Sequence, residues 1–209
     1  MPDFLTTGPA RADATLLLAH GAGAAMDSAF MTTIAEMLAA SGIRVVRFEF
    51  GYMAAARTGK RGATPRGESL MGEYRDAVAA LKAKGTLLIG GTSLGGRVAS
   101  MVAEELFTAG AIGGLVCLGY PFHPPGDASK LRTAHLKTMT APALICQGTR
   151  DPFGTRDEVP GYGLSPSITV HWLEDGDHDL KPRKAISGRT HKPNLEEAVA
   201  TIASFAAAR

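Results

Sequence analysis

The chain has 209 residues, 45% of them hydrophobic, and its formal net charge at pH 7 is +2. This length and composition are typical of one globular domain, here residues 1–209, with a single sizeable core. The near-neutral charge gives no indication of a nucleic-acid or membrane partner, and no run of 18 or more apolar residues predicts a transmembrane helix.

The cysteine usage and the first residues both bear on the cellular compartment. Cys117 and Cys146 lie inside apolar runs, which is typical of buried thiols in a cytoplasmic protein. The start of the chain is polar and interrupted by prolines, unlike a secretory signal. Two cysteines so far apart in the sequence do not predict a metal site.

Short apolar segments alternate with helical patterns along the chain. We expect strands at residues 15–20, 43–50, 86–91, 112–120, 143–148 and 168–174. Apolar residues at helical spacing predict helices at residues 28–40, 68–83, 95–109 and 193–207. Because the strands are apolar nearly throughout, both faces of the sheet should be covered. The expected fold class is therefore α/β, a doubly wound and mainly parallel six-stranded sheet with helices on both faces.

Three connections between these elements are long. Residues 121–142 have room for one short helix, at residues 127–139. The segments 57–66 and 181–194 are rich in lysine and arginine and are punctuated by glycine and proline. A solvated surface is the simpler interpretation of both basic segments, and a site for an anionic substrate or partner is the alternative.

Residues 91–95 read GTSLG and match G-x-S-x-G, the pattern of a nucleophilic serine on a sharp turn. The expected strand before Ser93 and the helix after it give this turn the strand–turn–helix setting that the pattern requires. Side chains at Gly91 and Gly95 would collide with the neighbouring strand and helix, and Gly96 should permit close helix packing. An ordinary glycine-rich turn with an idle serine is the alternative.

A serine nucleophile needs a histidine base, and an acid that orients the histidine. The pattern predicts the chain order serine, acid, histidine. Asp151 follows the expected strand 143–148, and His178 lies in the loop after the strand 168–174. Carboxyl ends of parallel strands share one edge of a sheet, so we expect Ser93, Asp151 and His178 to meet there.

Other acids near His178 compete with Asp151 for the orienting role. Asp175, Asp177 and Asp179 surround His178 in the sequence. An aspartate adjacent to a histidine rarely reaches the correct ring nitrogen, so Asp151 is preferred.

Acyl transfer also needs donors for the oxyanion that forms on the substrate. The backbone N–H of Leu94, at the start of a helix, is one candidate. The glycine-rich loop HGAGAAM at residues 20–26 offers the N–H of Ala22 or Gly23 as the second. We expect His20 to hold this loop in place and not to act as the base.

The same loop supports a rival interpretation as a dinucleotide-binding turn. A strand, Gly21-x-Gly23 and a helix are followed by a strand that ends near Glu49. The third glycine of that fingerprint is missing, because its position is Met26, and the acidic residue comes late. Nucleotide binding is therefore the weaker hypothesis.

Several motifs together resemble the α/β-hydrolase superfamily: LLLAHGAGAAMDSAFM, VVRFEFGYM, TGKRG, GGTSLGGRVAS, CLGYPFHPPG, QGTRDPFG and GDHDLKPRK. More narrowly, the chain is similar to a small family of hydrolase-like proteins that also has members in a nuclear histone-acetylation complex. The resemblance implies the fold and a catalytic set of Ser93, Asp151 and His178. The chain is short for the superfamily, so we expect neither its first two strands nor an inserted cap.

We therefore expect a cytoplasmic serine hydrolase that cleaves an ester, thioester or related acyl bond of a small-molecule substrate, without a metal or organic cofactor. In a capless site, loops must select the substrate. The candidate contacts are Tyr120, Phe122 and His123 after the fourth expected strand and Phe153 after the fifth, although each is also a candidate for packing. The alternative is a non-catalytic scaffold or interaction module on the same fold.

Overall fold

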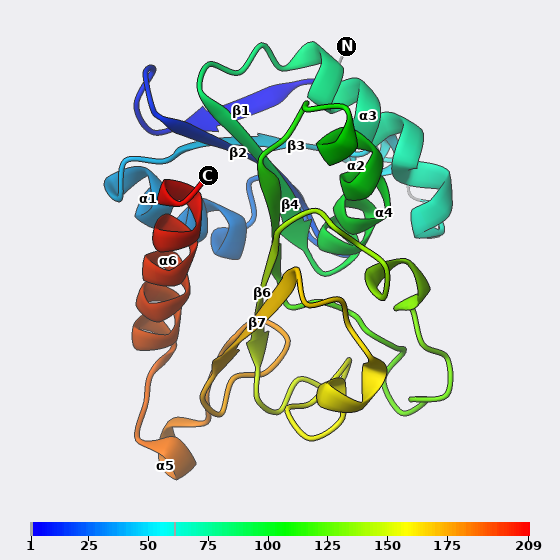
Figure 1. Ribbon diagram of the computed structural model, residues 1–209, viewed down its shortest axis with the longest axis vertical. Coiled ribbons are helices and arrows are strands. Elements are labelled where there is room, and N and C mark those ends of the chain that lie inside the picture. Colours follow the sequence, from blue (N-terminus) through cyan, green and yellow to red (C-terminus); the bar gives the residue numbers. More distant parts are fainter. Residues whose placement is uncertain (1, 61) are drawn as a thin grey trace.

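A computed structural model describes residues 2–60 and 62–209 and contains a seven-stranded sheet (Figure 1). The strand order is β1-β3-β2-β4-β5-β6-β7, and neighbouring strands are parallel except for the antiparallel pair β1–β3. The strands are β1 (Phe4–Thr7), β2 (Ala14–Ala19), β3 (Arg44–Phe48), β4 (Thr86–Thr92), β5 (Gly114–Leu118), β6 (Ala143–Gly148) and β7 (Ile168–Leu173). The mainly parallel α/β fold is confirmed, but the expectation of six strands is wrong by one.

The strand that the sequence pattern missed is β1, at one edge of the sheet. It has four residues and, among the strands of the described residues, pairs with β3 alone, with Phe4 opposite Phe48 and Leu5 opposite Arg47. An edge strand has one hydrogen-bonded neighbour, and β1 carries no continuous apolar run like those of the central strands. Its position within a polar, proline-interrupted segment therefore concealed it.

Helices cover both faces of the sheet, as expected (Figure 1). Leu16 and Leu18 of β2 share one core with Ile34 of α1, whereas Leu17 of the same strand packs in the opposite core with Val98 of α4. Helices α1 and α6 thus form one layer, and α3 and α4 form the other. The helices are α1 (Ala29–Ala40), α2 (Gly51–Arg57), α3 (Met71–Ala80), α4 (Leu94–Thr108), α5 (Lys184–Ser187) and α6 (His191–Ala207). Within the described residues, no helix has the length and apolar character needed to cross a membrane.

The long connections differ most from the sequence prediction. In place of a helix at residues 127–139 there is a single 3-10 turn at Ala134–Leu136. The backbone N–H of Arg132 donates to the carbonyl oxygen of Phe122, 2.7 Å away, so it does not join a helical ladder. Two short helices, α2 and α5, were not predicted, because α2 has seven residues and α5 four, and neither has a buried residue that would set up an apolar periodicity.

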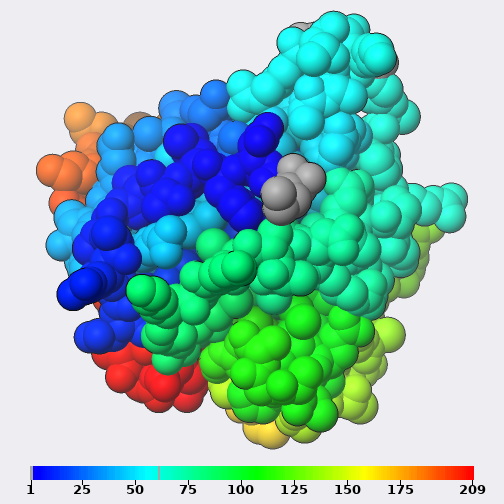
Figure 2. All heavy atoms as spheres, turned by 90° about the horizontal axis from the view of Figure 1, so that it is seen from above, coloured from blue at the N-terminus to red at the C-terminus, as the bar shows by residue number. Residues whose placement is uncertain are grey.

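Helix α2 begins immediately beyond the carboxyl end of β3. In the space-filling view its segment, coloured cyan, projects from the body of the molecule (Figure 2). The other parallel strands end at the same edge of the sheet, so α2 stands beside the loops that follow β2 and β4.

A buried tyrosine links helix α3 to the middle of the sheet. The Tyr74 hydroxyl accepts a hydrogen bond from the N–H of Gly90 (2.9 Å) and can donate to the carbonyl oxygen of Gly90 (2.7 Å) or Leu17 (3.1 Å). Burial raises the pKa of Tyr74 far above its ordinary value, so the phenol stays protonated. This contact lies in β4, three residues before Ser93.

We expect Tyr74→Phe to lower the free energy of unfolding by about 1–3 kcal/mol, because it leaves buried backbone groups of β4 without a partner. Tyr162→Phe is the matched control, since the buried Tyr162 hydroxyl has no hydrogen-bond partner in the described part of the chain. Removing that hydroxyl should be neutral or stabilising. Urea unfolding measures the free energy of unfolding of both variants. An equal decrease of this free energy in the two variants would contradict the assigned role of Tyr74.

Candidate functional site

Ser93 lies on the turn between β4 and α4 in a conformation that non-glycine residues seldom adopt. Its φ is 47° and its ψ is −115°. Such a conformation costs about 1–3 kcal/mol and persists only where the surroundings enforce it. Here the Ser93 N–H donates to the carbonyl oxygen of Leu118 on β5 (3.1 Å), which ties the turn to the neighbouring strand.

The glycines around Ser93 allow α4 to begin almost in contact with the sheet. A Cβ at Gly91 would lie 2.8 Å from the Ala19 carbonyl oxygen, and one at Gly95 would lie 2.6 Å from the carbonyl oxygens of Ala19 and His20. A Cβ at Gly96 would lie 2.8 Å from the Gly91 carbonyl oxygen. Real Cβ atoms do not come so close to backbone, so the space-clearing roles expected for these three glycines agree with the structure.

Ser93, His178 and Asp151 form one hydrogen-bonded relay, although 85 residues separate the serine from the histidine. His178 Nε2 lies 2.8 Å from Ser93 Oγ, and His178 Nδ1 lies 2.8 Å from Asp151 Oδ2. An ionised carboxylate can only accept, so Nδ1 carries the ring proton and Nε2 accepts from the serine hydroxyl. The structure thus brings the three residues together in the order that the sequence predicted.

Asp151 is fully buried, and its carboxylate is held by donors besides His178. Gln147 Nε2 donates to Oδ2 (2.8 Å), and the Phe153 N–H donates to Oδ1 (2.9 Å). Gln147 is itself fixed, because its Oε1 accepts from the Tyr120 N–H (2.6 Å). Sequence reasoning missed Gln147, and the available signal was a lone amide within the apolar strand ALICQG.

The competing aspartates are engaged elsewhere in the loop after β7. Asp175 pairs with Arg183, and Asp177 Oδ1 accepts the backbone N–H groups of Asp179 and Lys181. The Arg183 contact also lowers the pKa of Asp175. These acids therefore shape the loop, and Asp151 is the one that contacts His178.

Two further residues define the position of the His178 ring. Phe153 packs against it, with 4.2 Å between the ring centroids. Gly119 has a φ of 65°, and a Cβ there would collide with the His178 backbone carbonyl oxygen and lie 3.3 Å from Nδ1. The turn after β5 must therefore lack a side chain for His178 to approach Asp151, a requirement that sequence analysis did not find.

The candidate oxyanion donors lie beside Ser93. Ala22, Ser93 and Leu94 line the same pocket, and Gly23 lines an adjoining one. Within residues 2–60 and 62–209, the N–H groups of Leu94, Ala22 and Gly23 donate to no protein acceptor. They are thus free to bind a developing negative charge.

The loop that carries Ala22 is held by two aromatic side chains. The Tyr52 hydroxyl donates to the Ala22 carbonyl oxygen (3.1 Å), and burial is the main cause that raises the pKa of Tyr52 to about 12. His20 is fully buried, its Nδ1 donates to the Gly21 carbonyl oxygen (2.7 Å) and its Nε2 accepts the Phe50 N–H (3.1 Å). Burial lowers the pKa of His20, which keeps it neutral. His20 is therefore a structural residue, as expected.

Of the four candidate substrate contacts, one reaches the pocket. Phe153 lines it, whereas Tyr120 and Phe122 are 0% exposed and His123 is 2% exposed. Tyr120 and Phe122 pack against each other, with ring centroids 4.8 Å apart, because the chain turns into the core at Gly119. The expected substrate contact for these three residues is therefore corrected to packing, and Pro121 between them lines the pocket instead.

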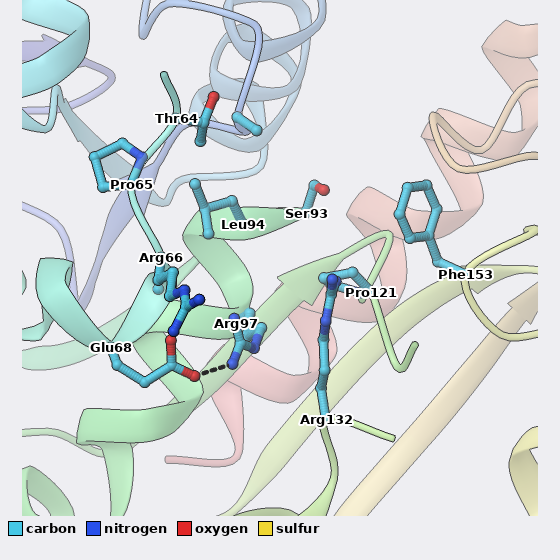
Figure 3. Close-up of a pocket in the computed structure, with 12 residues that line it drawn as sticks. Thr64, Pro65, Arg66, Glu68, Ser93, Leu94, Arg97, Pro121, Arg132 and Phe153 are labelled. Atoms are coloured by element: carbon cyan, nitrogen blue, oxygen red, sulfur yellow. Dashed lines mark hydrogen bonds and ion pairs between the residues drawn. The ribbon is translucent and has the colours of Figure 1, made fainter. Parts of the chain in front are cut away.

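The pocket beside Ser93 has a volume of about 510 Å³ and a basic wall (Figure 3). Arg66 of the expected basic segment 57–66 reaches it, but Lys181 and His191 of the second basic segment line a separate groove along α1. Arg97 and Arg132 also line the pocket. Sequence analysis missed both, since the helices expected at residues 95–109 and 127–139 do not indicate which of their basic side chains reach the pocket.

In the rival dinucleotide-binding interpretation, Glu49 would have to bind a ribose hydroxyl, but its carboxylate is already occupied by protein donors. Glu49 accepts the Met26 N–H (3.1 Å) and both Nε and Nη2 of Arg57 (2.7 Å each). A carboxylate held by these donors is not open to a ribose hydroxyl. Across the described ranges, no group of three or more His, Cys, Asp or Glu side chains is placed to hold a metal ion.

Comparison with known proteins agrees with this architecture. A model of the α/β hydrolase domain family matches residues 12–207. The chain belongs to this family. Its fold is shared with solved esterases.

Three solved structures illustrate the likeness. XC6422 from Xanthomonas campestris, an α/β serine hydrolase without a lid, is 20% identical, with a TM-score of 0.66 over 96% of this chain and 89% of that one. Est1E from Butyrivibrio proteoclasticus, solved with ferulic acid, is 13% identical, with a TM-score of 0.72 over 100% and 96%. The esterase domain of a Rhodothermus marinus protein is 18% identical, with a TM-score of 0.64 over 96% and 90%. At these identities the likeness concerns the fold.

We expect Gly95→Ala to be strongly destabilising, because its methyl group would overlap two backbone carbonyl oxygens at the end of β2. Gly72→Ala in α3 is the matched control, since a Cβ there meets nothing within 4 Å and alanine favours the helix by up to about 1 kcal/mol. Thermal unfolding distinguishes the two substitutions. Equal stability of the variants would show that α4 is not packed as closely as described.

Proposed function

We propose that this protein is a serine hydrolase that cleaves an ester, thioester or related acyl bond through a covalent acyl-enzyme. The observation that carries the proposal is the relay of two 2.8 Å contacts from Ser93 through His178 to Asp151. A serine hydroxyl that donates to a neutral, oriented histidine is the arrangement that activates a poor nucleophile.

In the first half-reaction, Ser93 Oγ attacks the substrate carbonyl carbon while its proton moves to His178 Nε2. The carbon–oxygen bond to Ser93 forms, and the carbonyl oxygen becomes an oxyanion. His178 then gives that proton to the leaving alcohol or thiol as its bond to the acyl carbon breaks. Asp151 stays ionised and stabilises the imidazolium between these two steps.

The oxyanion is stabilised by backbone donors in this proposal. The Leu94 N–H is at the start of the 15-residue helix α4, where the helix dipole adds positive potential. Ala22 N–H is the second donor, with Gly23 N–H as the alternative. Each such donor contributes roughly 3 kcal/mol to the transition state.

In the second half-reaction, water replaces the leaving group. His178 Nε2 takes a proton from the water as its oxygen attacks the acyl carbon. The bond to Ser93 Oγ then breaks, the carboxylic acid leaves, and Ser93 regains its proton. No metal or organic cofactor takes part in these steps.

The substrate is proposed to be a small acyl compound, and the place of action the cytoplasm. The alternative of a non-catalytic scaffold comes from the narrower resemblance to the family with members in a nuclear histone-acetylation complex. A scaffold gains nothing from a strained serine in contact with a histidine, so the strain at Ser93 favours the enzyme.

Hydrolysis of short-chain 4-nitrophenyl esters tests the relay. Ser93→Ala should abolish turnover, and Asp151→Asn should lower kcat by about 10³–10⁴-fold, because the amide cannot orient the imidazole as the carboxylate does. Asp179→Asn is the matched control, as Asp179 is exposed and adjacent to His178 in the sequence. It should retain the activity of the unaltered protein.

Two results would contradict this assignment. Full turnover by Ser93→Ala would show that Ser93 is not the nucleophile. A decrease in kcat for Asp179→Asn as large as that for Asp151→Asn would show that Asp151 is not the specific acid that orients His178.

Tyr52→Phe tests the proposed loop donor. The substitution removes the hydrogen bond that fixes the Ala22 carbonyl oxygen, so the adjacent N–H groups lose their alignment with the oxyanion. We expect kcat to fall by about 10-fold, within the range for a weakened oxyanion contact, while KM stays nearly constant. A change confined to KM would place Tyr52 in substrate binding instead.

A further inference from the structure

Three arginines from separate parts of the chain line the pocket that holds Ser93 and Leu94. Arg66 precedes the 3-10 turn at Gly67–Leu70, Arg97 lies in the first turn of α4, and Arg132 lies in the connection after β5. Among the described residues that line the pocket, Glu68 is the only acid. The wall therefore carries two more positive than negative charges.

Glu68 neutralises the left-hand side of this wall as drawn in Figure 3. Its carboxylate pairs with Arg97, and a hydrogen bond from its own backbone N–H, followed by the charges of Arg97 and Arg66, lowers the pKa of Glu68. Arg97 is only 15% exposed, and its Nε is buried without a hydrogen-bond partner in the described part of the chain. The carboxylate of Glu68 thus forms an ion pair with Arg97 and lies near the charge of Arg66.

Arg132 has no such partner. Within residues 2–60 and 62–209, its guanidinium makes no hydrogen bond and no ion pair, although the side chain is partly buried. The backbone N–H of Arg132 donates to the carbonyl oxygen of Phe122, which fixes the backbone from which the side chain extends. Burial first, and then the nearby charge of Arg97, lower the pKa of Arg132. A guanidinium nevertheless keeps its proton at neutral pH, so its five donors remain available to an anion.

The remaining lining suits the carbon chain that would lead to such an anion. Leu94 and Pro121 lie between Ser93 and the arginine side chains in Figure 3, whereas Phe153 lies on the opposite side of Ser93, toward which the hydroxyl points. A substrate whose carbonyl carbon is at Ser93 would pass Pro121 before it meets Arg132. Arginine binds carboxylate and phosphate oxygens through paired donors, which fixes orientation as well as charge.

We propose that the substrate of this hydrolase carries an anionic group, a carboxylate or a phosphate-like group, that Arg132 binds with Arg97 beside it. The inference rests on the proposed function, because the anion and the bond attacked by Ser93 belong to one molecule. It assigns Arg132 to substrate selection and leaves the chemistry at Ser93 unchanged.

Matched pairs of esters test the selection directly. The 4-nitrophenyl monoester of adipic acid is compared with the 4-nitrophenyl ester of adipamic acid, which has the same length but a neutral amide end. A third ester, 4-nitrophenyl 5-phosphonopentanoate, separates phosphate-like from carboxylate recognition. A second pair, the butanoate esters of 4-hydroxybenzoate and 4-hydroxybenzamide, places the charge on the leaving group.

We expect kcat/KM for an anionic member of at least one pair to exceed that of its neutral partner by roughly 10-fold or more, as charge-assisted hydrogen bonds imply. Arg132→Gln should bring this ratio close to one while kcat/KM for the neutral ester stays nearly constant, and Arg132→Lys should restore part of it. Arg11→Gln is the charge-matched control, because Arg11 is exposed and precedes β2, far along the strand from its carboxyl end. Its ratio should equal that of the unaltered protein.

The outcomes separate this inference from the proposed function. Turnover of the neutral esters without preference for an anion, or a preference that survives Arg132→Gln, overturns the inference and leaves the hydrolase intact. If no ester is cleaved, the proposed function is contradicted, and calorimetric titration with adipate then decides the inference. Adipate binding that is lost in Arg132→Gln supports the anion site, and no binding to the unaltered protein overturns it.

Discussion

The close contact between the start of α4 and the end of β2 is the constraint on which the site depends. Gly91 and Gly95 have no side chains, so α4 can begin directly behind the sheet edge. Ser93 is then held at a φ of 47°, with its hydroxyl at His178 Nε2 and the Leu94 N–H free. The same helix start places Arg97 one turn beyond Ser93, where it lines the same pocket.

The partners of Ser93 depend on a second, buried arrangement at the ends of β5 and β6. Gln147 joins the backbone of Tyr120 to the carboxylate of Asp151. Every polar atom in this chain of contacts is paired, which makes a buried polar network rigid instead of costly. Gly119 leaves the space that lets His178 reach Asp151. The catalytic geometry proposed for this protein thus requires an amide and a glycine that never touch the substrate.

The positions of Ser93, Asp151 and His178 could be predicted because each lies within five residues of the end of a strand. Parallel strands end at one edge, so a residue just beyond each end needs no further information to be placed. The prediction failed for residues whose side chains face the core or the pocket according to the direction that the chain takes beyond the strand. Tyr120 and Phe122 turn inward at Gly119 and become core residues, whereas Pro121 between them faces the pocket.

The edge strand β1 and the arginine wall escaped prediction for related reasons. Phe4–Thr7 is too short and too polar to resemble a buried strand, and its pairing with β3 is a long-range property. Arg132 lies in a connection without regular structure, so nothing in its neighbours indicates where its side chain points. Periodicity describes helices and strands, but it carries no information about irregular segments, and those segments form much of the pocket wall.

Mass spectrometry after reaction with a fluorophosphonate tests the central claim, that Ser93 is the nucleophile. Trypsin releases residues 85–97 as one peptide in which Ser93 is the only serine. We predict a single covalent adduct on Ser93 of the folded protein, and none after heat denaturation or in Ser93→Ala. An unlabelled but folded protein, or an adduct at another residue that persists in Ser93→Ala, would contradict the account.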